Sequence, residues 1–156
     1  MAVLQTTYGN DYAKGFAGMV ANGETSNRIS RTVEVSGGLG FGVPAFRSSD
    51  HGVNATVAAA TFLGITIANY AAPAVVATGV QADIYPQYST AAIMTQGVIW
   101  VLASSDVTDG DAVYVGDGDP LAVSLFSNSA TGNVALAGWS FQDTVSSGSL
   151  VRIAKR

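Results

Sequence analysis

The chain has 156 residues and a formal net charge of −4, and only 12% of its residues are charged, where about 25% is usual for a soluble domain. Its seven basic residues are scattered, which argues against nucleic acid as a partner, because phosphate binding needs clustered Lys and Arg. The absence of cysteine excludes disulfides, thiolate-bound zinc and a cysteine nucleophile.

The middle of the chain is nearly free of charge. Between His51 and Ser105 the only charged side chain is Asp83. Charged side chains normally keep a protein surface hydrated and prevent it from associating with other molecules. A stretch with so little charge is therefore expected to lie either in lipid or largely against other protein. Polar and helix-breaking residues such as Asn69 and Pro73 leave no apolar run of about 18 residues, and we expect no membrane span. The N-terminus has neither a basic nor an apolar signal region, so we expect no signal peptide.

Residues 1–27 differ from the rest of the chain. Tyr8, Tyr12, Phe16 and Met19 follow one another at spacings of four, four and three, which is helix periodicity. The glycines between them weaken an isolated helix. Two interpretations stay open: a short helix packed on its own domain, or an arm that orders only against another chain and buries these side chains there.

From residue 28 onward the pattern is strand and turn. Residues 29–35 alternate apolar and polar side chains, as a half-buried strand does. Residues 39–46 predict a second strand, in which Pro44 suggests a sheet edge. The pattern then predicts strands over 53–59 and 61–70 and a surface loop over 71–78.

The second half of the chain continues this rhythm. Residues 97–102 are the most apolar strand candidate, at the expected centre of the core. Asp109 and Gly110 predict a hairpin turn. Further strands are expected over 83–88, 91–103, 112–115, 121–126, 134–141 and 149–154, with a second turn over 116–120. About nine short strands indicate one all-β domain over residues 28–156, a β-barrel or a β-sandwich.

No constellation of catalytic or metal-binding residues emerges. His51 is the only histidine and follows Asp50, but no G-x-S-x-G sequence is present and the position is a turn. Five carboxylates cluster near the turns predicted in the second half of the chain: Asp106, Asp109, Asp111, Asp117 and Asp119. Their spacing does not match that of a calcium-binding loop. We expect solvated turns there, no catalytic residue, no cofactor and no metal.

The order of these elements resembles the structural cement (capsid decoration) proteins of tailed bacteriophages. The likeness covers nearly the whole chain and is carried by short segments in sequence order: 1–8, 16–21, 29–32, 40–43, 62–66, 97–101 and 110–115. None of these segments is a chemical motif. Their order and spacing together make the match.

The resemblance implies an accessory protein on the outer surface of the phage head. Such proteins, often trimers, clamp neighbouring copies of the major capsid protein against internal DNA pressure and carry no enzymatic residues. It favours an N-terminal capsid-binding arm over 1–27, in which Tyr8, Tyr12, Phe16 and Met19 are the candidate anchors, since aromatic residues dominate interface hot spots. The expected partners are the major capsid protein and further copies of the chain, with neither nucleic acid nor membrane.

Three rival functions share some of these features. A fimbrial or other filament subunit shares the low charge and the strands, but is expected to carry an export signal. A carbohydrate-binding β-sandwich favours exposed aromatic residues; Trp100 is predicted to be buried in its apolar strand, and Trp139 is left open. A small hydrolase would depend on His51.

Overall fold

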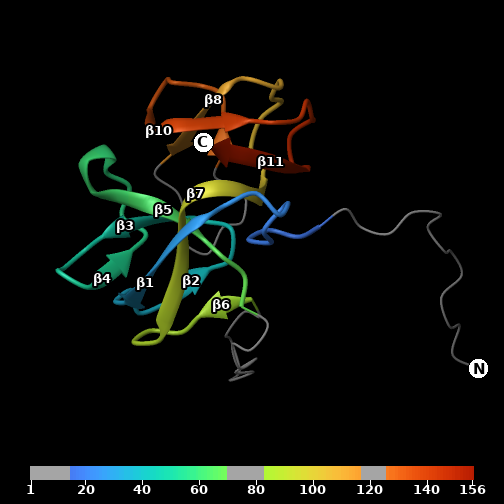
Figure 1. The fold of residues 1–156 in the computed structure, drawn as a ribbon. Helices are drawn as coiled ribbons and strands as arrows, with labels where there is room; N and C mark the ends of the chain where they lie inside the picture. Colours follow the sequence, from blue (N-terminus) through green and yellow to red (C-terminus); the bar gives the residue numbers. More distant parts are fainter. Residues whose placement is uncertain (1–14, 70–82, 117–125) are drawn as a thin grey trace, which may run out of the picture.

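The computed structural model describes residues 15–69, 83–116 and 126–156, and the fold is all-β (Figure 1). One 3₁₀ turn, η1 (Ala59–Thr61), interrupts eleven strands in the described residues. The strands are β1 (Asn27–Val33), β2 (Leu39–Gly40), β3 (Pro44–Arg47), β4 (Gly52–Asn54), β5 (Phe62–Thr66), β6 (Ile84–Tyr85), β7 (Thr90–Leu102), β8 (Ala112–Gly116), β9 (Phe126–Ser127), β10 (Asn133–Phe141) and β11 (Leu150–Lys155).

The long strand β7 belongs to two sheets at once. Its first half pairs with β1 on one edge and with β5 on the other. Because β1, β4, β3 and β5 also pair in that order, these five strands close into a small barrel. The second half of β7 pairs with β11, from Leu102 opposite Leu150 to Gly97 opposite Lys155. The two sheets therefore lie one above the other and share a single strand (Figure 1).

The second sheet also curls back on itself. Its strand order is β7-β11-β10-β8-β9, and a bridge between Ala103 and Phe126 brings β9 back to the end of β7. The Ser104 N–H donates to the Phe126 carbonyl at 2.7 Å at the same place. Curling of this kind leaves little exposed sheet edge, which protects a β protein from unwanted pairing.

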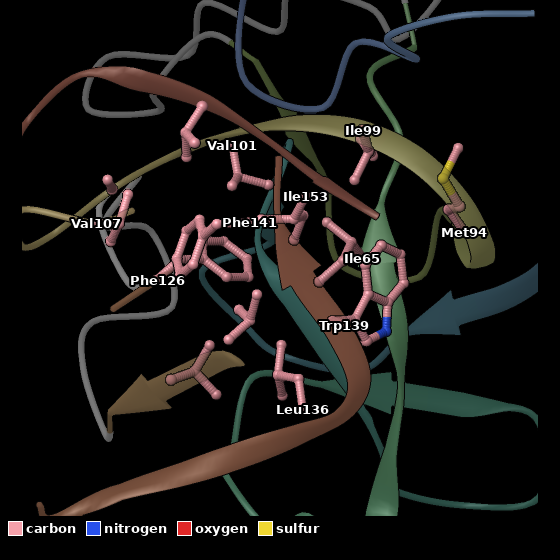
Figure 2. Close-up of a cluster of buried hydrophobic side chains, with 14 of the residues drawn as sticks. Ile65, Met94, Ile99, Val101, Val107, Phe126, Leu136, Trp139, Phe141 and Ile153 are labelled. Carbon is pink, nitrogen blue, oxygen red and sulfur yellow. The ribbon is translucent and has the colours of Figure 1, made fainter. Parts of the chain in front are cut away.

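Each sheet encloses its own apolar core. The barrel is filled by a cluster that includes Val33, Leu39 and Tyr85. A larger cluster fills the second sheet and extends to Ile65 and Met94 of the barrel, so the two sheets share packing as well as β7. Figure 2 shows this larger cluster, with the Trp139 indole from β10 drawn next to Ile65 from β5. Trp139 is only 3% exposed.

The strand predictions over 29–35, 91–103, 134–141 and 149–154 are confirmed to within a few residues. The predicted single strand over 39–46 is wrong, because a turn at Phe41 and Gly42 divides it into β2 and β3. Pro44 does not mark an edge: β3 lies between β4 and β5. Proline is tolerated there because it is the first residue of the strand.

The hairpin predicted at Asp109 and Gly110 is also wrong in part. The turn exists, with the Asp111 N–H donating to the Thr108 carbonyl at 3.0 Å. The strands on either side do not pair with each other, since β8 lies between β10 and β9. The predicted loop over 71–78 and turn over 116–120, and all but the end of the predicted strand over 121–126, lie outside the described residues.

Among the described residues, no helix has the length and hydrophobicity needed to span a bilayer.

Gly97 marks the point where β7 passes from one sheet to the other. Its φ is +130°, and a Cβ placed there would lie 2.7 Å from the Cβ of Ser26. We expect Gly97→Ala to lower the free energy of unfolding by about 2 kcal/mol or more, through backbone strain together with the clash. Chemical denaturation measures this change.

Gly110→Ala is the matched control. Gly110 also has a positive φ, +89°, but an added Cβ would meet no atom within 4 Å. Gly110→Ala should therefore lower the free energy of unfolding through backbone strain alone, by about 1 kcal/mol. Equal losses for the two variants would contradict a steric role for Gly97.

Candidate functional site

The four predicted anchor residues fall in two different regions. Tyr8 and Tyr12 lie outside the described residues. Phe16 is 38% exposed and is one of two large hydrophobic side chains that the described surface exposes, the other being Tyr88. Met19 is half-buried. The described structure thus contains the end of the predicted arm, residues 15–27.

Residues 15–21, which we call the root segment, pair with the second half of β7. The Gly18 N–H donates to the Trp100 carbonyl at 2.8 Å, and the Trp100 N–H donates to the Met19 carbonyl at 2.9 Å. The Ala21 N–H donates to the Val98 carbonyl at 3.0 Å. The root segment therefore lies along the free edge of β7, with an isolated antiparallel bridge between Val20 and Ile99.

The short helix considered for the N-terminal region does not form over the root segment. The segment has a turn at Ala17 and Gly18 and is otherwise without helix. Its backbone groups are used by β7 instead, which supplies the hydrogen bonds that a helix would have made internally. Tertiary pairing has overridden the helical spacing of the side chains.

Two glycines let the root segment approach the barrel closely. Gly18 has φ +84°, and a Cβ there would lie 2.8 Å from the Gly42 nitrogen. Gly42, with φ +67°, would place a Cβ 2.4 Å from the Gly18 nitrogen. The Ala68 N–H donates to the Gly18 carbonyl at 2.8 Å. The backbone of the root segment is thus held against the barrel as well as against β7.

Trp100 supports the start of the root segment. A Cβ added at Gly15 would lie 3.0 Å from the Trp100 Cδ1, so the glycine backbone packs on the indole. The Arg152 guanidinium lies 5.7 Å from the Trp100 ring centroid, a cation–π distance. Arg152 is itself held by two hydrogen bonds to the Asp143 carboxylate, at 2.9 and 2.5 Å.

The prediction for the tryptophans needs correction. Trp100 is half-buried rather than buried, and Trp139 is the buried one. The indole Nε1 of Trp139 has no hydrogen-bond partner. Neither tryptophan among the described residues is exposed as a sugar-binding platform would be.

An ion pair joins the end of this region to the C-terminus. The Arg156 guanidinium lies 3.1 Å from the Glu24 carboxylate and also donates to the Gln142 side-chain oxygen at 2.9 Å. The hydrogen bond from Arg156 and a second one from Asn22 hold the pKa of Glu24 below its usual value of 4.5. The pair is exposed, so its contribution at neutral pH is small.

The other candidate chemistries receive no support in the described residues. His51 is exposed on the turn before β4, and its side chain makes no hydrogen bond or ion pair there. Asp111 accepts hydrogen bonds from the Thr108 N–H and the Asn128 amide, and Asp106 accepts from the Ser147 N–H, which are structural turn contacts. No group of three metal-ligating side chains comes together in the described part of the chain.

We expect Gly18→Ala to loosen the root segment. The added Cβ clashes with backbone atoms of the barrel and strains a positive φ. Amide exchange at Ala21 and Trp100 should become about tenfold faster, which corresponds to about 1.4 kcal/mol of local stability. Gly23→Ala is the control, since a Cβ there meets nothing within 4 Å, and it should leave both amides unchanged.

Stability should also depend on pH through Glu24. Because the folded pKa of Glu24 is lowered, its contribution is present above about pH 4.5 and is lost as the pH falls below that value. We expect the midpoint temperature of thermal unfolding to decrease as the pH is lowered below 4.5. The decrease should be smaller in Glu24→Gln than in the wild type. An identical pH profile for the two proteins would contradict a role for the Glu24–Arg156 pair.

Comparison with known proteins gives a consistent result. A family model described as structural cement protein (E217 gp24/Pam3 gp6) matches residues 4–155. A chain in the solved structure of the capsid of Myoviridae phage XM1 superposes with a TM-score of 0.70 at 16% sequence identity, covering 98% of this chain and 97% of that one. At this identity the likeness concerns the fold. A comparison with curated proteins gives no significant match.

Proposed function

The chain belongs to the structural cement proteins of phages, and we propose that it binds the outer face of the head and clamps neighbouring major capsid protein subunits together. It is a structural protein of the virion, located on the capsid. The finer proposal is that the N-terminal region makes the capsid contact and that the all-β domain holds that region in place. No catalytic step, nucleic acid or membrane has a part in this function.

The anchoring of the root segment carries this proposal. Residues 15–21 are hydrogen-bonded to β7 and pack closely against the barrel. A force on residues 1–14 would therefore be transmitted directly to the central strand of the domain. Phe16 is exposed within this anchored segment. A capsid-binding arm needs such a fixed base, because otherwise tension would peel it away from the domain.

The side chains of the N-terminal region suit a protein contact. Tyr8, Tyr12 and Phe16 are aromatic, and the first charged residue along the chain is Asp11. Aromatic side chains that fill apolar pockets of a partner supply most of the binding energy in many interfaces. We propose that these residues, with Met19 beside them, dock on the major capsid protein.

We further propose that the protein acts as a homotrimer. Three arms on one trimer would contact several capsid subunits at once, and linked contacts bind far more tightly than each one alone. Modest individual contacts would then suffice to hold the shell. Only 12% of the residues are charged, so charge repulsion between copies would oppose such a trimer little.

Deleting residues 1–14 should abolish binding to heads while leaving the domain folded. The root segment begins at Gly15, so this deletion spares every described contact with β7. Purified protein is added to undecorated heads, and occupancy is measured by sedimentation and imaging, with thermal unfolding as the check on folding. Full occupancy by the shortened protein would refute the arm.

The double variant Tyr8→Ala and Tyr12→Ala tests the side chains in the full-length chain. Loss of an aromatic anchor commonly weakens an interface by about 2 kcal/mol, or roughly 30-fold. The matched control is Gln5→Ala with Thr7→Ala, which alters neighbouring polar residues and should leave occupancy unchanged. A deletion that reached Ala21 would be a poorer test, because it would also remove the root segment and its pairing with β7.

A further inference from the structure

The loop of residues 86–89, which we call the Tyr88 loop, presents the most exposed aromatic side chain of the described surface. Tyr88 is 76% exposed, and its φ is +65°, a region that side chains other than glycine rarely adopt. The loop lies between β6 and β7 and leads directly into Thr90, the first residue of β7.

Hydrogen bonds hold the Tyr88 loop in this strained shape. The Tyr88 N–H donates to the Val33 carbonyl at 2.7 Å, and the Ser89 N–H donates to the Pro86 carbonyl at 3.0 Å. The Gln87 side-chain amide donates to the Glu34 carbonyl at 3.2 Å. The backbone of the loop is therefore fixed to the end of β1, and the Tyr88 side chain is left exposed there.

No contact among the described residues accounts for a tyrosine at this position. Glycine or asparagine would adopt the same φ at lower cost. A ring that stays in water gains no burial energy for the isolated protein. Backbone strain that the surrounding structure maintains is typical of binding positions.

The Tyr88 loop and the root segment lie at opposite ends of β7 (Figure 1). The loop precedes Thr90, whereas the root segment pairs around Ile99 and Trp100. At about 3.3 Å per residue, the two ends are separated by about 30 Å along the strand. A protein that clamps two subunits needs two contacts at separate places on its surface.

We infer that Tyr88 is a second anchor, which inserts into an apolar pocket on a major capsid protein subunit other than the one that the N-terminal arm contacts. This inference rests on the proposed clamping function and names the second half of the clamp. The Tyr88 loop itself, residues 86–89, carries no charge. The pocket that fits it is therefore apolar, with a polar group for the phenol hydroxyl.

The capsid subunit fits this contact better than a second copy of the chain. Anchors at interfaces usually meet apolar surface on the partner. Among the described residues, the only other large hydrophobic side chain that is exposed is Phe16. A second copy would therefore offer little described apolar surface to receive the ring.

The test replaces Tyr88 with glycine in the full-length protein. Tyr88→Gly removes the ring and also relieves the positive φ, so the variant should be at least as stable as the wild type. Its affinity for undecorated heads should nevertheless fall by about tenfold or more. Tyr88→Phe keeps the ring and should stay within a few-fold of the wild type.

Asp83→Gly is the matched control for backbone strain. Asp83 is exposed and also has a positive φ, +68°, at the other side of β6, but it carries no ring. Asp83→Gly should leave head binding unchanged. If it weakens binding as much as Tyr88→Gly does, the ring is not the anchor and the inference fails.

Two further outcomes separate this inference from its premise. Unchanged head binding by Tyr88→Gly, with normal binding by the wild type, would overturn the inference and leave the proposed function standing. Weaker self-association of free Tyr88→Gly in analytical ultracentrifugation would assign the ring to a contact between copies and would also overturn it. Failure of the wild type to bind heads would overturn the proposed function, and the inference with it.

Discussion

The whole structure depends on the hydrogen-bonding capacity of one strand. Every residue of β7 has one backbone donor and one acceptor, and a strand has two edges. In the first half these edges are taken by β1 and β5, and in the second half by β11 and the root segment. The change of partners is possible because β7 bends at Gly97, where the barrel ends and the second sheet begins. Both cores, and the base of the N-terminal region, are therefore built on the same thirteen residues.

This arrangement explains part of the unusual charge distribution. β7 and the residues next to it lie between two cores, so a charged side chain there would be taken out of water without a partner, which is costly. The apolar character of residues 97–102 is needed for folding. A low charge in this region is thus not by itself evidence of a protein interface. The exposed Tyr88 carries more information, because burial in the domain does not explain it.

The sequence was most informative where a local pattern decides the structure. Alternation over 29–35 and the apolar run over 91–103 predicted β1 and β7, since the burial of one strand depends mainly on its own side chains. Pairing between distant segments was not predictable. Nothing near Val20 indicates that it pairs with Ile99, so the spacing of Phe16 and Met19 was equally compatible with a helix. The same limit applies to Pro44, which is tolerated inside the sheet because it begins its strand, and to the Asp109–Gly110 turn, whose flanking strands pair elsewhere. For the candidate site, residue type pointed to Phe16, whereas the strained backbone at Tyr88 is visible only in three dimensions.

The same geometry bears on how a cement protein resists force. In the clamp that we propose, tension between two capsid subunits would enter at the N-terminal region and leave through the opposite end of β7. Along this path the load would be carried by hydrogen bonds of the root segment to β7, of β7 to β1, and of the Tyr88 loop to the end of β1. Many such bonds lie side by side, so they share the load and no single one has to be strong. A clamp built in this way needs no catalytic group and little charge, but it does need a continuous strand between its two contacts. In the proposed clamp β7 would provide this connection, which would give a mechanical reason for its thirteen residues, where the other described strands have nine or fewer.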